Sequence, residues 1–95
     1  MMRSERIYGE RWDVFPAMPP RPRAILDVGC GPGLGFQSYR QNGTRIVGVD
    51  IDPAVIAEAR QRLDDARLLD VEAEPWPEDF KGAFDVVAVT DCLLI

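Results

Sequence analysis

Four apolar runs recur along the chain, and each reaches glycine or an acidic residue at or just after its end. They cover residues 24–28, 45–50, 66–70 and 83–89. Short runs rich in branched apolar residues are typical of parallel strands buried on both faces. Residues 53–63 place apolar side chains at helical spacing, so they predict a helix whose apolar stripe packs on the sheet. A shorter helix is expected at residues 36–41, ended by Asn42 and Gly43.

The chain ahead of the first run has a different character. Four prolines lie between residues 16 and 22, which predicts an extended linker. Residues 4–12 are expected to form a short helix with Trp12 on its apolar side. We therefore divide the chain into an N-terminal arm and Pro-rich linker, residues 1–23, and a folded unit, residues 24–95.

Glycines at alternate positions follow the first predicted strand: Gly29, Gly31, Gly33 and Gly35. A strand that turns through glycines into a helix is typical of nucleotide-like ligand sites, because backbone N–H groups and a helix N-terminus can approach the ligand. The dinucleotide fingerprint would need its third glycine at the position of Leu34. Asp27, just before the loop, would also repel a pyrophosphate. Both departures argue against a dinucleotide and favour a ligand that carries an ammonium or sulfonium group.

A second acid ends the second predicted strand. Asp50 lies 21 residues after Gly29, close to the offset of about 20 residues at which an acid meets ribose hydroxyls. Asp52 is better explained as the cap of the following helix, with Pro53 at its first position. Ile51, between the two acids, is expected against an adenine face.

The run DVGCGPG at residues 27–33, followed by VDIDP at residues 49–53, resembles the class I S-adenosylmethionine-dependent methyltransferases. The resemblance covers about residues 21–91, which is the cofactor half of that family. It implies that the glycines make room for the methionyl group with Asp27 near its ammonium, that Asp50 holds the ribose, and that Asp70 and Val71 hold the adenine. The cofactor-binding residues expected in this way are Asp27, Gly29, Cys30, Gly31, Gly33, Asp50, Ile51, Asp70, Val71 and Thr90.

The same resemblance bears on both ends of the chain. In the family an N-terminal segment often folds over the cofactor, so Tyr8 or Arg11 could reach the methionyl carboxylate; the alternative is that Tyr8 and Trp12 cover an apolar flank. Residues past the fourth strand line the methyl-transfer side, which makes Thr90 a candidate for the pocket and Asp91 a candidate general base.

The expected fold class is α/β, a Rossmann-like three-layer sandwich with a truncated parallel sheet of strand order 3-2-1-4 and right-handed crossovers. The family's sheet continues with three more strands that this sequence does not supply. We therefore expect a truncated half-domain, or the ordered part of a longer chain, with the fourth strand at an exposed edge. Such an edge would favour a homodimer in which two fourth strands pair.

Composition limits the kinds of partner and ligand that this chain is expected to bind. A net charge of −5 and a pI near 4.6 give no footprint for nucleic acid, and no N-P-P-Y or D-P-P-Y run follows the fourth strand, so a small-molecule methyl acceptor is favoured. Two cysteines without any histidine predict neither a disulfide scaffold nor a metal site. The charged N-terminus and the absence of a long apolar run predict a cytoplasmic protein without a membrane segment. The predicted function is S-adenosylmethionine-dependent methyl transfer; the alternative is an inactive cofactor-binding or oligomerisation module.

Overall fold

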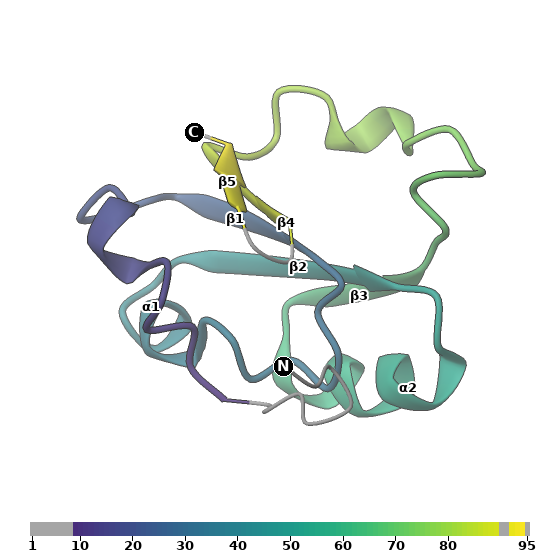
Figure 1. Ribbon diagram of the computed structural model, residues 1–95, viewed down its shortest axis with the longest axis horizontal. Coiled ribbons are helices and arrows are strands. Elements are labelled where there is room, and N and C mark those ends of the chain that lie inside the picture. The colour runs from purple at the N-terminus through teal and green to yellow at the C-terminus, as the bar shows by residue number, and fades with distance from the viewer. Residues whose placement is uncertain (1–8, 90–91, 95) are drawn as a thin grey trace.

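A computed structural model describes residues 9–89 and 92–94 of the 95-residue chain. The described strands form one sheet in the order β3-β2-β1-β4-β5 (Figure 1). Their bounds are β1 Ala24–Val28, β2 Arg45–Asp50, β3 Asp65–Leu68, β4 Val86–Val89 and β5 Cys92–Leu94. β1 to β4 run parallel, which confirms the predicted order 3-2-1-4. All five residues of β1 are buried, as a central strand requires.

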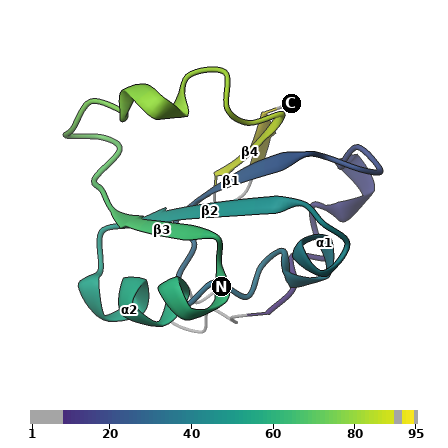
Figure 2. The same cartoon turned by 180° about the vertical axis from the view of Figure 1, so that it is seen from behind.

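The two faces of the sheet are covered differently (Figures 1 and 2). Helices α1 (Gln37–Gln41) and α2 (Pro53–Arg62) lie on one face, and the β3–β4 connection with the 3-10 helix η3 (Glu78–Phe80) lies on the other. Neighbouring residues of a strand serve opposite faces. Ile25, for example, packs in the helix-side core with Ile56, while Leu26 packs in a second core with Phe80. The three layers of the predicted fold are therefore present, and the third is thin.

Helix α2 begins and ends where the sequence indicates. The Asp52 carboxylate caps it by accepting a hydrogen bond from the Ala54 N–H at 2.9 Å, and Pro53 occupies the first turn. Ile56 and Ala59 are its buried residues, in agreement with the predicted stripe. No helix in the described part of the chain is long and apolar enough to cross a membrane.

Two strand boundaries differ from the prediction. β3 starts at Asp65 and ends at Leu68, because the residues after it turn away: the Asp70 carbonyl accepts from the N–H groups of Ala73 and Glu74 at 3.1 and 2.9 Å. β4 starts at Val86, three residues later than residue 83.

The predicted extended linker is also wrong over part of its length. Phe15–Ala17 forms the 3-10 helix η2, which the fixed φ of the proline at its start favours. Of the helix expected at residues 4–12, residues 4–8 lie outside the described residues, and residues 9–12 are not helical.

The expectation that β4 lies at an open edge is contradicted. β5 pairs antiparallel with it, with Val87 opposite Leu94 and Val89 opposite Cys92. Antiparallel strands need only a two-residue connection, so a short C-terminal segment is sufficient to cover this edge. A dimer through β4 is incompatible with this pairing, since the backbone groups it would use already bond β5.

Candidate functional site

The predicted site lies at the carboxyl ends of the parallel strands, where the glycine loop, residues 29–35, follows β1. Asp50, the last residue of β2, bonds both to the glycine loop and to the turn that follows β2. One carboxylate oxygen accepts from the Gly31 N–H at 2.9 Å, and the other accepts from the Asp52 N–H at 3.1 Å. The acid expected to bind ribose therefore lies directly against the glycine loop.

The backbone N–H groups of this loop are turned toward the protein. Gly29 and Cys30 both donate to the Val49 carbonyl of β2, at 2.8 and 3.1 Å, and Gly31 donates to Asp50. The glycine pattern suggested backbone N–H groups that point toward a ligand. At these three positions the N–H groups bond to the protein instead.

The start of α1 is likewise occupied. Glu10 reaches over from the N-terminal segment, and one of its carboxylate oxygens accepts from the Ser38 N–H in the first turn at 2.8 Å. An acid in this position satisfies the unpaired N–H groups and the partial positive charge of a helix start. The second oxygen of Glu10 is buried without a hydrogen-bond partner. The start of this helix is therefore bonded to a protein carboxylate in this structure.

Helix α2 supports the loop from beneath. Gly33 has φ +90°, a left-handed conformation that favours glycine, and a Cβ there would lie 3.1 Å from the Leu63 Cγ and 3.4 Å from the Ala59 Cα. The Arg62 guanidinium donates to the Pro32 carbonyl at 2.9 Å. The loop is thus packed against a helix that the sequence predicts from its cap and apolar stripe.

Cys30 contributes packing beneath the loop. It belongs to the helix-side core, and its thiol lies in the space left by Gly48 of β2, where a Cβ would be only 2.6 Å from the sulfur. The thiol donates to the neighbouring Gly31 carbonyl at 3.3 Å. The sequence prediction counted Cys30 among the ligand-lining residues, but its side chain faces the core.

The Asp27 carboxylate and the first part of the Arg11 side chain both lie beside Gly35, at the end of the loop. Asp27 is 4% exposed, and a Cβ on Gly35 would lie 3.4 Å from its carboxylate oxygen and 3.0 Å from the Arg11 Cγ. The Arg11 N–H donates to the Gly35 carbonyl at 2.7 Å, which fixes the N-terminal segment across the loop. The Arg11 guanidinium binds both oxygens of Asp13, with Nε–Oδ1 at 2.9 Å and Nη2–Oδ2 at 2.8 Å. This hydrogen-bonded pair lowers the pKa of Asp13 below its usual value.

Arg11 could be singled out from the sequence, whereas Glu10 and Asp13 were not predicted. The signal was present as the acidic residues on either side of Arg11 in GERWD, residues 9–13. Their partners, however, depend on how the segment crosses the loop, which no local pattern gives.

The residues expected at the adenine are less closely assembled. Ile51 is 68% exposed beside Asp50. Asp70 and Val71 lie beyond the end of β3, and the Leu69 N–H bonds the Asp50 carbonyl at 3.0 Å, which keeps this segment at the same edge of the sheet. One Asp70 oxygen accepts from the Glu72 N–H at 3.0 Å in its own turn.

Thr90 and Asp91, the residues expected on the methyl-transfer side, lie outside the described residues.

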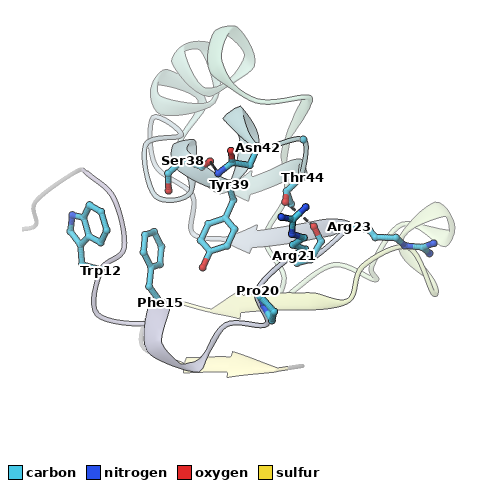
Figure 3. Close-up of a pocket in the computed structure, with 11 residues that line it drawn as sticks. Trp12, Phe15, Pro20, Arg21, Arg23, Ser38, Tyr39, Asn42 and Thr44 are labelled. Atoms are coloured by element: carbon cyan, nitrogen blue, oxygen red, sulfur yellow. Dashed lines mark hydrogen bonds between the residues drawn. The ribbon is translucent and has the colours of Figure 1, made fainter.

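A cavity of about 720 Å³ lies elsewhere, between the linker and α1 (Figure 3). Pro22 precedes β1 and Thr44 precedes β2, so the cavity lies at the amino ends of the strands, opposite the glycine loop. Phe15 and Tyr39 line it, with ring centres 5.0 Å apart in an edge-to-face contact. No pattern in the sequence predicted this cavity, and it is separate from the predicted site.

Comparison with known proteins identifies the family. A family described as "Methyltransferase domain" matches residues 25–95. The chain is 35% identical over 75 residues to ubiquinone biosynthesis O-methyltransferase of Pseudomonas paraeruginosa, which covers 75% of this chain and 32% of that protein. It is 37% identical over 65 residues to trans-aconitate 2-methyltransferase of Escherichia fergusonii, covering 66% of this chain and 25% of that protein.

Comparison with solved structures also finds a methyltransferase. The fold is similar to the crystal structure of a TehB-like SAM-dependent methyltransferase from Corynebacterium glutamicum, with a TM-score of 0.61 and 27% identity, covering 79% of this chain and 42% of that one. The chain spans about a third or less of the length of the two curated relatives it matches here.

Proposed function

Because the chain belongs to the methyltransferase domain family, we propose that it is the S-adenosylmethionine-binding part of a methyltransferase that acts on a small molecule. The named relatives support this, since one is called SAM-dependent and two carry the names of small-molecule acceptors or pathways. The observation that carries the proposal is the contact of Asp50 with Gly31, which sets the acid of β2 against the glycine loop at 2.9 Å.

The Asp50 carboxylate is suited to two vicinal ribose hydroxyls. An ionised carboxylate has about four acceptor positions, and the N–H groups of Gly31 and Asp52 use two of them. Two positions remain, and the two backbone bonds hold the carboxylate in one orientation. Asp50 would therefore bind the ribose without first having to be ordered.

The charges beside Gly35 fit the amino-acid end of the cofactor. Asp27 supplies an anion for the ammonium, and Arg11 supplies a guanidinium for the carboxylate. Gly29, Gly31 and Gly33 would leave room for the chain between them. The inward direction of the loop N–H groups supports a ligand without phosphates at this point.

Ile51, Asp70 and Val71 would hold the adenine, and Thr90 would lie on the methyl-transfer side with Asp91 as a candidate base. When bound, the cofactor supplies a methyl group already activated by its sulfonium. The residues of this chain then bind and orient it toward the acceptor, and alignment alone can provide much of the rate.

We also propose that the chain consists of an arm, residues 1–23, and a cofactor-binding half-domain, residues 24–95, on which the arm closes. The protein is proposed to be cytoplasmic. A homodimer formed by sheet extension would use the edge of β5, because β4 is already paired on both sides. Sedimentation of the purified chain at several concentrations tests the dimer directly.

Calorimetric titration with S-adenosylhomocysteine, and with NADH as a control, tests the proposed function. Saturable binding of the first ligand alone is expected. Asp50→Ala is expected to weaken it by about 1–3 kcal/mol, because hydrogen bonds to a charged group are lost. Asp52→Ala is the matched control: it removes a helix cap worth ~1 kcal/mol of stability but should leave the affinity unchanged. Equal affinity of wild type and a folded Asp50→Ala variant would refute the ribose assignment.

The alternative is a cofactor-binding module that does not transfer methyl groups. Binding of S-adenosylhomocysteine without methylation of any small-molecule acceptor would support this alternative, whereas turnover with one acceptor would exclude it.

A further inference from the structure

We propose that Asp13 is an internal competitor for the carboxylate of the cofactor: it occupies the guanidinium of Arg11 until the ligand displaces it. This inference rests on the proposed function, since it concerns the control of the same site. It assigns Asp13 a role in setting cofactor affinity rather than in binding the cofactor.

The Arg11–Asp13 pair has the geometry of a bidentate contact between a guanidinium and a carboxylate. Arg11 holds Asp13 through two parallel hydrogen bonds of 2.9 and 2.8 Å, which is the arrangement by which arginine recognises a free carboxylate. The site beside Gly35 thus already contains a bidentate carboxylate receptor with a carboxylate in it. Asp27 lies by the same glycine, so an acceptor for an ammonium group is adjacent. Together they match the two charges of an α-amino acid.

Arg11 and Asp13 are held in different ways. The Arg11 backbone is fixed to the Gly35 carbonyl at 2.7 Å, and its side chain is 23% exposed. The Asp13 carboxylate accepts from Arg11 and from backbone N–H groups of its own turn, and its side chain is 62% exposed. Asp13 can therefore rotate into water while the Arg11 backbone and the first part of its side chain stay beside Gly35.

A local turn creates the pair. The Val14 N–H donates to the Arg11 carbonyl at 3.1 Å, and Val14 is buried in the helix-side core. This turn places Asp13 beside Arg11, two positions away along the chain. Because the pKa of Asp13 is lowered, the competing group is ionised at neutral pH. Exposed ion pairs are weak, so a ligand carboxylate can replace it.

The test compares two ligands on one variant. S-adenosylhomocysteine carries the amino-acid carboxylate, and 5′-methylthioadenosine lacks it. Asp13→Asn is expected to lower the Kd of the first by about two- to fivefold, the range expected for an exposed ion pair, and to leave the Kd of the second unchanged. Glu78→Gln, which removes one charge from the exposed Glu78–Lys81 pair, is the control and should change neither.

A second variant tests whether Asp13 acts through Arg11. Arg11→Met is expected to weaken S-adenosylhomocysteine, and adding Asp13→Asn to it should no longer improve the affinity. The inference is overturned if Asp13→Asn leaves or raises the Kd of S-adenosylhomocysteine, or if it tightens both ligands equally. In those cases wild-type binding still supports the proposed function. Failure of the folded wild type to bind S-adenosylhomocysteine would overturn both.

Discussion

Gly48, in the middle of β2, is the position at which one methyl group should disturb both the core and the glycine loop. A Cβ at this residue would lie 2.6 Å from the Cys30 sulfur, 2.8 Å from the Cys30 Cβ and 2.8 Å from a Leu63 methyl carbon. The Leu63 methyl is the end of a flexible side chain and can move. The Cys30 Cβ is attached directly to the loop backbone, so relieving that contact must shift the segment between Gly29 and Gly31.

The expected cost follows from two opposing effects. Alanine is more favourable than glycine inside a strand by roughly 0.5–1 kcal/mol. Overfilling a packed core costs about 1–3 kcal/mol. Because the contacts are well inside van der Waals distance, we expect the second effect to be larger, with a net destabilisation of about 0.5–2 kcal/mol by Gly48→Ala. For a domain of this size each kcal/mol lowers the Tm by about 4–8 °C.

Urea unfolding followed by tryptophan fluorescence measures this cost, and titration with S-adenosylhomocysteine measures the effect on the loop. Gly9→Ala is the control, because nothing lies within 4 Å of a Cβ at Gly9. In a Cys30→Gly background, Gly48→Ala should cost less, since its most rigid neighbour is gone. Unchanged or increased stability of Gly48→Ala would refute the argument that Cys30 and Gly48 share one space.

Three further predictions concern the framework of the site. Asp85→Ala should destabilise the fold by about 1–3 kcal/mol, because two N–H groups at the start of β1, each 2.8 Å from the Asp85 carboxylate, lose a charged acceptor. Urea unfolding measures this change, and a loss of stability below about 0.5 kcal/mol would contradict it. Burial opposes the ionisation of Asp85 and Asp64, but hydrogen bonds outweigh it and lower the pKa of both below the usual value: backbone N–H groups donate to Asp85, and the Ile46 N–H and Arg40 donate to Asp64. The folded state therefore binds fewer protons than the unfolded state, so stability should be constant from pH 7 to about 5 and fall as the pH passes below 4; a flat urea midpoint down to pH 3 would exclude this. Arg67→Met should loosen η3, because Arg67 binds both oxygens of Asp79 and lies 4.8 Å above the Phe80 ring; faster proteolytic cleavage within residues 71–85 is the expected readout, and an unchanged cleavage rate would count against it.

The parts of the fold that the sequence predicted are those in which several local signals coincide. β2 and α2 are examples, since an apolar run or stripe is bounded by an acid, a cap and a proline. Asp50 could be placed against the glycine loop because the carboxyl ends of adjacent parallel strands share one edge. These relations depend on spacing along the chain, which the sequence contains.

Other features depend on contacts that spacing does not determine. Glycine permits many backbone conformations, so the pattern could not say whether the loop N–H groups face a ligand or Val49. β5 is only three residues long, and its existence follows from pairing with β4 rather than from its own composition. The pairing of Arg11 with Asp13 and the reach of Glu10 to α1 require knowledge of the path of the arm.

The thin third layer has a consequence for the dynamics of the native state. Of residues 71–85, Phe80 alone is buried, yet this segment covers the core that contains Leu26 and Val47. Segments with few buried contacts open at a lower free energy than the global unfolding step. Amide hydrogen exchange should accordingly divide the molecule into two cooperative units, with fast exchange in 71–85 and slow exchange in β1 and α2. Because Asp70 and Val71, proposed above to hold the adenine, lie at the start of this segment, we expect bound cofactor to slow exchange there.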